Sequence, residues 1–367
     1  MSTNLVTSQK ALRLSSEHIR LPGPIYTRII MMNNTASARP PRRYKLFFWI
    51  ILGAFSTFFA EVTAGSTPFP FFAPWGILIV FPLYFLHTLF FFSIVFSYGK
   101  PTLGSLYAAG LLFGMYEAYL TKVVWTSYSP DGPMLSVGGI AIFETLMLVV
   151  FWHSVLAFML PLLIGETYLT KSRELVGLLP QWVRKRGRLL FTLLLIWAGL
   201  FTSVNSPSPL ISILSTFSSG AVLLLLMVVW KKKGGDNYSM RELLPTRKAC
   251  KVIAVFLILM YVGYSRLLHW DKLPGFGPQF IVWAIYAALI WLLINNIRKS
   301  RQDKIAATTV VGFSWKTPVF FLLLFVLSAV IGELLHIEIV LILFSFLLII
   351  FPGLFLLYWS VKKAVSS

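Results

Sequence analysis

The stretch VGGIAIFETLMLVVFWHSVLAFMLPLLIG, residues 137–165, is a long apolar run that contains one charged residue, Glu144. About 20 apolar residues in an α-helix are enough to cross the hydrocarbon core of a membrane. This stretch is therefore predicted to be a transmembrane helix. Nine further runs of the same kind lie at residues 44–62, 75–97, 102–124, 189–204, 209–230, 250–264, 277–296, 317–335 and 337–361. Two of these runs, 189–204 and 250–264, are short, so nine or eleven helices are the alternatives to ten.

The composition is that of a membrane protein. Hydrophobic residues make up 57% of the chain and charged residues 12%, whereas an ordinary soluble domain has about 25% charged residues. The net charge of +19 is carried by short loops beside apolar runs rather than by a basic stripe on a folded domain. We therefore expect no nucleic-acid partner. The single cysteine, Cys250, excludes an internal disulfide.

The lysines and arginines indicate the orientation of the chain. If the N-terminus lies inside, 29 of the 32 fall on the cytoplasmic side and only Lys122, Arg266 and Lys272 fall outside. Basic residues are retained on the cytoplasmic side of membranes. The sequence thus predicts an all-α, polytopic transmembrane bundle of about ten helices with both termini cytoplasmic, placed in the cytoplasmic (plasma) membrane.

Three regions follow from this topology. Residues 1–43 are polar and basic, and we expect a flexible cytoplasmic tail. Residues 44–361 form the transmembrane domain, and residues 362–367 form a second short cytoplasmic tail. On the outer side, residues 66–75 carry three prolines among aromatic residues, which excludes a continuous helix. This segment is either an interfacial surface loop or a lid over a cavity.

Three prolines fall within predicted helices, at Pro82, Pro161 and Pro352. Such prolines are tolerated in membrane helices where neighbouring groups satisfy the freed carbonyl. Each of them is a predicted kink.

Ionisable residues inside the membrane are costly and normally functional. The candidates for binding a substrate or proton are Glu61, His87, Glu117, Glu144, His153 and Glu333. Glu117 and Glu144 each lie seven residues from the outer end of adjacent antiparallel helices, at a depth of roughly 10 Å. We expect these two carboxylates to lie at one level.

The direction in which the Glu117 side chain points follows from the residues on the same side of its helix. Gly110, Gly114, Glu117 and Thr121 share one stripe, and the two glycines form a surface on which another helix packs closely. Glu117 is therefore predicted to point into the bundle. Glu61 lies on a similar small, polar stripe, but near an outer end where it can reach water.

The histidines lie deeper by the same calculation, His87 at roughly 18 Å and His153 at roughly 24 Å. The order from Glu117 and Glu144 through His87 to His153 descends towards the cytoplasm, as a proton relay would. The alternative is two neutral histidines that donate to backbone carbonyls. Glu144 and His153 are nine residues apart, which places them on opposite faces of a straight helix.

The sequence predicts no metal centre and no cofactor. Glu333 and His336 have the spacing used in di-iron bundles, but the second such pair that those sites need is absent from the sequence. Phosphate-binding loops, zinc-protease motifs and nucleophile elbows are absent as well. No catalytic residue is assigned, and the sequence leaves open whether the protein is an enzyme.

Three functions are compatible with these residues. The first is a small-solute or proton/cation-coupled transporter with an outward-facing cavity centred on Glu117 and Glu144. The second is a membrane enzyme that acts on a lipid or isoprenoid, with the same carboxylates as general acid and base. The third is a non-catalytic scaffold or assembly factor. The expected partners are the lipid bilayer and a small solute, a proton or a lipid ligand.

Overall fold

The computed structural model describes residues 40–127, 132–300 and 316–366. The chain divides at Pro40, and all described helices belong to the unit of residues 41–367. Most of the predicted tail of residues 1–43 lies outside the described residues, so its flexibility stays a prediction.

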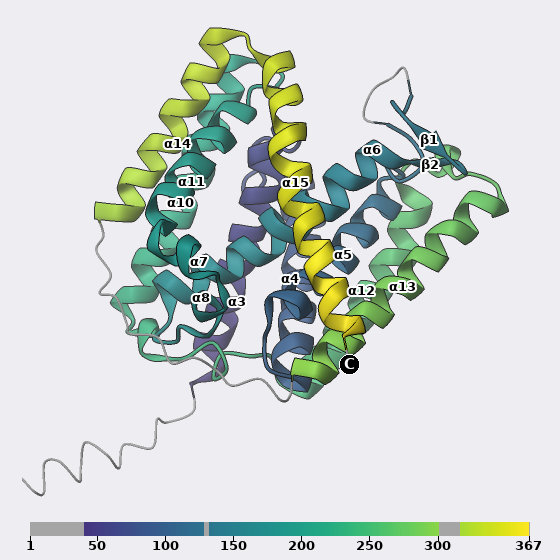
Figure 1. Cartoon of the computed structure of the whole chain (residues 1–367). Helices are drawn as coiled ribbons and strands as arrows, with labels where there is room; N and C mark the ends of the chain where they lie inside the picture. Colours follow the sequence, from purple (N-terminus) through teal and green to yellow (C-terminus); the bar gives the residue numbers. More distant parts are fainter. Residues whose placement is uncertain (1–39, 128–131, 301–315, 367) are drawn as a thin grey trace, which may run out of the picture. The chain divides into compact units, whose positions relative to one another are not determined.

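Helices make up nearly all of the regular structure (Figure 1). The elements of the first half are α3 Arg42–Thr57, η1 Phe58–Val62, η2 Gly76–Val80, α4 Phe81–Tyr98, α5 Leu103–Leu120, β1 Ser136–Val137, β2 Ile140–Ala141, α6 Ile142–Thr145, η3 Leu146–Met159 and α7 Leu160–Leu169. Those of the second half are α8 Glu174–Leu178, α9 Gln181–Lys185, α10 Gly187–Phe201, α11 Pro209–Lys232, η4 Gly235–Asn237, α12 Arg247–Leu267, η5 Trp270–Lys272, α13 Phe276–Ser300, α14 Lys316–Leu335 and α15 Glu338–Val365. The segments η1, η2 and η3 are π-helical.

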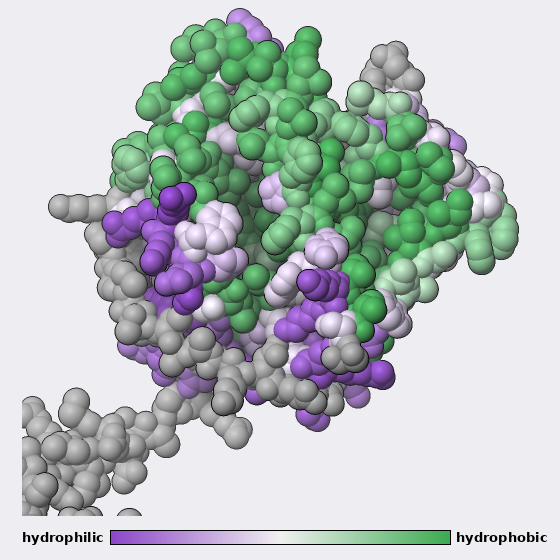
Figure 2. All heavy atoms as spheres, viewed as in Figure 1, coloured by the Kyte–Doolittle hydropathy of each residue, from purple (hydrophilic) through white to green (hydrophobic). Residues whose placement is uncertain are grey.

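The predicted all-α, polytopic membrane fold is confirmed. Each of the ten apolar runs contains a helix, and among the described residues eight helical spans are long and apolar enough to cross a membrane. Helices α5 and α10 are not among these eight, so the count of ten crossings stays a prediction. Figure 2 shows hydrophobic residues over most of the visible face and hydrophilic residues gathered towards its lower end, where Figure 1 places the C-terminal end of α15.

The helix of the fourth apolar run, predicted at residues 137–165, begins later than predicted. Residues 137–141 belong to a two-stranded antiparallel hairpin, in which Val137 pairs with Ile140, and the helix starts at Ile142. The turn consists of Gly138 and Gly139, which have φ angles of 60° and 77°. Two consecutive residues with positive φ form the tight hairpin turn that glycine favours. The Gly-Gly pair was therefore a signal for a turn within the apolar run.

Two of the predicted proline kinks take the form of π-helical turns. Pro82 and Pro161 stand in the first turns of α4 and α7, directly after η2 and η3. Proline cannot donate the α-helical bond to the carbonyl four residues earlier, and its ring clashes with that carbonyl. For Pro161 this carbonyl belongs to Ala157, and it accepts a hydrogen bond of 2.5 Å from the Ser56 hydroxyl. A neighbouring helix thus satisfies the freed group.

The closest helix packing in the first half joins α5 to η3, which lie side by side in Figure 1. A Cβ atom added at Gly110 would lie 2.7 Å from Ser154 Cα, and one at Gly114 would lie 2.8 Å from Val149 Cα. Only glycine permits so short an approach of the two backbones. The predicted small-residue packing surface is confirmed. It places the next turn of α5, with Glu117, against the middle of η3.

The remaining helices pack in two groups. Helix α10 packs along α14, and α11 contacts both α14 and the α3–η1 helix. Helix α13 packs on α5 and α15, while α12 packs on α4.

Candidate functional site

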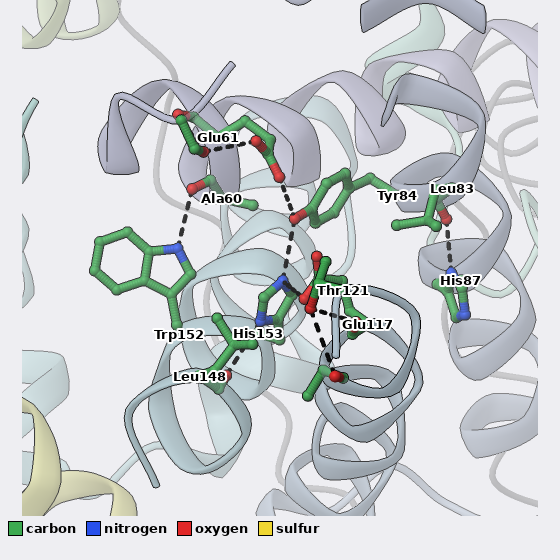
Figure 3. Close-up of polar contacts among 12 residues, drawn as sticks. Ala60, Glu61, Leu83, Tyr84, His87, Glu117, Thr121, Leu148, Trp152 and His153 are labelled. Carbon is green, nitrogen blue, oxygen red and sulfur yellow. Dashed lines mark hydrogen bonds and ion pairs between the residues drawn. The ribbon is translucent and has the colours of Figure 1, made fainter. Parts of the chain in front are cut away.

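Four titratable side chains from four segments form one connected polar chain in the core (Figure 3). The Tyr84 hydroxyl donates to Glu61 Oε1 at 2.6 Å and lies 3.1 Å from His153 Nε2. His153 Nε2 lies 3.5 Å from Glu117 Oε2. The order is therefore Glu61 of η1, Tyr84 of α4, His153 of η3 and Glu117 of α5.

Glu61 stands at one end of this chain. Its Oε2 accepts hydrogen bonds of 2.7 Å from Ser66 and 2.5 Å from Thr67. These two residues begin the proline-rich segment 66–75, and the backbone N–H of Phe69 donates to Ser215 Oγ of α11 at 3.0 Å. The segment is therefore tied both to the carboxylate and to a neighbouring helix. Residues 66–69 therefore cover Glu61 and are held in place at both ends.

His153 is held in one orientation. Its Nδ1 lies 3.1 Å from the carbonyl oxygen of Leu148, five residues earlier in η3, and the side chain is 2% exposed. A carbonyl oxygen only accepts, so Nδ1 carries hydrogen and Nε2 is the free position of the neutral ring. Nε2 is the nitrogen that faces both Tyr84 and Glu117. The imidazole can therefore receive a proton from either neighbour.

Glu117 ends the chain on α5. The glycine stripe one turn earlier brings this face of the helix against η3, so the carboxylate meets His153. Its Oε2 is buried and makes no hydrogen bond to any described residue, and the 3.5 Å contact with His153 is an ion-pair contact. A buried carboxylate oxygen needs a partner or a proton. Glu117 can therefore hold a proton.

The sequence-based order of depth was wrong for His153. It contacts Glu117 and so lies at the same level, whereas the prediction placed it roughly 14 Å deeper. One reason is that the helix that carries His153 starts at Ile142 rather than at residue 137. In addition, η3 winds with π-helical i to i+5 bonds, which advance less per residue than the 1.5 Å of an α-helix. Calculations that assume straight α-helices therefore place His153 too deep.

Glu117 and Glu144, which the sequence predicts to lie at one level, have different partners in the structure. Glu144 is 5% exposed, and its Oε1 accepts hydrogen bonds from Ser127 Oγ at 2.7 Å and from the Met134 N–H at 3.4 Å. Glu144 thus contacts the loop that joins α5 to the β-hairpin, while Glu117 contacts His153. As expected from their spacing, Glu144 and His153 do not share a site.

His87 lies beside the chain without joining it (Figure 3). Its Nδ1 lies 2.7 Å from the Leu83 carbonyl, and its ring stacks on Phe113 with centroids 4.7 Å apart. The side chain is 1% exposed, and its Nε2 has no hydrogen-bond partner among the described residues. This arrangement matches the alternative of a neutral histidine that donates to a backbone carbonyl.

Glu333 lies apart from these residues, near the C-terminal end of α14. The side chain is buried, and its Oε1 has no partner among the described residues. His336 contacts Glu338 instead, with 3.8 Å between Nδ1 and Oε1. The part of the chain that the structure describes contains no group of three or more His, Cys, Asp or Glu side chains placed to hold a metal ion.

Sequence reasoning missed the roles of Tyr84 and Glu166. Tyr84 links Glu61 to His153, but a tyrosine in a strongly aromatic helix carries no signal that separates it from core packing. Glu166, near the end of α7, is fully buried, and its carboxylate accepts the backbone N–H groups of Leu175 and Val176 at 3.0 and 2.8 Å. An acidic side chain at a helix N-terminus is a capping contact, so Glu166 has a structural role.

Comparisons with known proteins agree with the architecture. The model of a family described as "Uncharacterized membrane protein family" matches residues 50–362. An uncharacterized protein of Archaeoglobus fulgidus is 36% identical over 256 residues, which cover 68% of this chain and 78% of the relative. No solved structure matches. The family match spans nearly all of the described helices, from α3 to α15, and the chain therefore belongs to this family of multi-pass membrane proteins.

Proposed function

We propose that the protein is a proton-coupled transporter of the cytoplasmic membrane, in which Glu61, Tyr84, His153 and Glu117 form the proton pathway. The observation that carries this proposal is the continuity of the chain. Its donor–acceptor distances are 2.6 and 3.1 Å, followed by an ion-pair contact of 3.5 Å, across four different segments. Ionisable groups aligned in this way within a membrane domain mark proton relays.

Each link has the chemistry that a relay needs. A tyrosine hydroxyl both donates and accepts, so Tyr84 can pass its proton to His153 and take another from Glu61. With Nδ1 already bonded to the Leu148 carbonyl, protonation at Nε2 produces an imidazolium next to the Glu117 carboxylate. The proton then moves to Glu117, whose buried Oε2 has no other partner among the described residues.

A small polar cavity lies beside Thr67, which contacts Glu61. It has a volume of about 10 Å³, close to the space that one water molecule occupies. Its polar lining is made of hydroxyl groups, from Thr67, Thr202, Ser206, Ser212, Ser215 and Thr216. The Thr67 hydroxyl also donates to Glu61. This cavity therefore lies on the other side of Thr67 from the first carboxylate of the relay, where one water molecule fits among hydroxyl groups.

Proteoliposomes test the proposal directly. A potassium diffusion potential set by valinomycin drives proton entry, and a pH-sensitive dye inside the vesicles reports it, with and without an opposing sodium gradient. We expect the wild-type protein to acidify the lumen. Tyr84→Phe keeps the ring but removes the bridging hydroxyl, and we expect the rate to fall at least tenfold. Glu117→Gln should have the same effect.

Tyr107→Phe is the matched control. The Tyr107 hydroxyl donates to the carbonyl oxygens of Val150 and Gly353 at 2.7 and 2.8 Å, and so it ties helices together outside the relay. This variant should lose stability but keep proton entry. Equal rates for the wild type, Tyr84→Phe and empty vesicles would refute the transporter. A lipid-modifying activity that requires Glu117 would favour the enzyme instead, and partner binding retained in both variants would favour the scaffold.

A further inference from the structure

A second, apolar cavity lies between α3–η1, α7, α10, α11 and α14. Its volume is about 80 Å³. Six phenylalanines line it, namely Phe55, Phe58, Phe59, Phe191, Phe321 and Phe325. Apart from the Tyr168 hydroxyl, every lining side chain is apolar. This cavity suits a hydrocarbon chain and offers almost nothing to a polar solute.

The cavity extends towards the predicted cytoplasmic surface. Tyr168 lies next to the last residue of α7, and Phe191 lies in the second turn of α10. Both helix ends are cytoplasmic in the predicted topology. Arg188 lies in the first turn of α10, one turn before Phe191. A basic side chain therefore lies at this end of an otherwise apolar cavity.

Arg188 belongs to a short basic segment, residues 182–188, with the sequence WVRKRGR. Its four basic residues are all exposed, and Trp182 at its start is 61% exposed. Tryptophan prefers the headgroup depth of a membrane, and clusters of Lys and Arg on the cytoplasmic side of a transmembrane helix attract anionic headgroups. The segment thus provides charge complementary to a phosphate directly before the helix that lines the cavity.

We propose that this cavity and the segment 182–188 form a binding site for one anionic membrane lipid. One hydrocarbon chain of the lipid occupies the space between α10, α11 and α14, and its phosphate lies against the basic segment. Burial of each methylene contributes to binding, and the phosphate sets the preference for an anionic over a zwitterionic lipid. The four residues of the proton relay do not line this cavity, so the lipid site does not depend on the proposed function.

Native mass spectrometry of the full-length protein, released from nanodiscs that contain equal amounts of phosphatidylglycerol and phosphatidylcholine, tests this site. We expect one phosphatidylglycerol to remain bound. The double variant Arg184→Gln/Arg188→Gln should weaken its retention by about thirty-fold and abolish the preference over phosphatidylcholine. The control variant Lys362→Gln/Lys363→Gln removes the same charge at the end of α15 and should leave retention unchanged.

A change inside the cavity tests the hydrocarbon chain separately. Gly220 of α11 lines the cavity opposite the side chain of Leu322. Gly220→Leu fills this space and should reduce the retention of both lipids. Equal retention of both lipids by the wild type and all variants would show only the ordinary lipid shell and would overturn the proposal. If retention responds to the charges but not to Gly220→Leu, the phosphate site stands and the chain site is refuted.

Discussion

Two glycine-to-alanine substitutions, one at the contact between α5 and η3 and one away from it, should have different effects on stability. At Gly114, an added Cβ atom would lie 2.8 Å from Val149 Cα and 3.2 Å from His153 Cβ, whereas ordinary contacts begin at 3.4 Å. The two segments must therefore separate by about 0.6 Å at this point to accept alanine. At Gly263 of α12, an added Cβ atom meets nothing within 4 Å.

The magnitudes follow from two opposing terms. Alanine in place of glycine within a helix contributes about 1 kcal/mol of stability, and this gain applies at both positions. Overpacking a tight contact costs about 1–3 kcal/mol, and this cost applies only at Gly114. We therefore expect Gly263→Ala to raise the free energy of unfolding by up to about 1 kcal/mol. Gly114→Ala should be less stable than Gly263→Ala by about 1–3 kcal/mol.

The same separation should impair the proposed relay. Glu117 follows Gly114 by less than one turn, and its carboxylate lies 3.5 Å from His153 Nε2. Moving α5 away by about half an ångström lengthens this contact to about 4 Å, the limit of an ion pair. Unfolding in denaturing detergent and proton entry into proteoliposomes measure the two effects. If both variants show equal stability and wild-type proton entry, the close contact between α5 and η3 is refuted.

Three further substitutions have defined outcomes. Glu144→Gln should keep proton entry within twofold of the wild type, because its carboxylate contacts Ser127 and Met134 and not the relay. A tenfold loss would show that Glu144 takes part in the relay. Ser56→Ala removes the donor to the Ala157 carbonyl, which Pro161 leaves without its α-helical bond, and should lower the free energy of unfolding in detergent by about 1–3 kcal/mol. The control Ser265→Ala removes an exposed hydroxyl and should lower it by no more than about 0.5 kcal/mol. Trp230→Phe removes a buried indole that donates to the last carbonyl of α7 and should lower thermal stability by about 2–3 kcal/mol, whereas the exposed Trp182→Phe should not.

The helices were predictable because each apolar run determines its own local structure. The run predicted at 209–230 corresponds to α11 at Pro209–Lys232, and the run at 337–361 corresponds to α15 at Glu338–Val365. The small-residue surface of α5 was predictable for the same reason, since the spacing of its glycines is a local property of one helix.

The pairing of the polar residues was not predictable, because it depends on where helices begin and how they wind. The depth of His153 was calculated for a straight α-helix, but fourteen residues around it are π-helical. Pro161 is a local signal for an irregular turn, but it does not indicate that the fourteen residues of η3 wind as a π-helix. Tyr84 was missed because its role exists only once three other segments surround it.

The sequence predicted a pair of carboxylates, Glu117 and Glu144, whereas the structure pairs Glu117 with His153. This difference changes the electrostatics of the proposed mechanism. Two buried carboxylates that share one proton retain a net negative charge, which is costly in a low-dielectric interior. With one proton, Glu117 and His153 are neutral together, either as an acid beside a neutral ring or as a carboxylate beside an imidazolium. The proton can therefore move between them without changing the net charge that the core must hold. A second proton, or the loss of the first, leaves a net charge. The geometry thus favours the exchange of single protons, and this suits a carrier that couples one proton to each transport step.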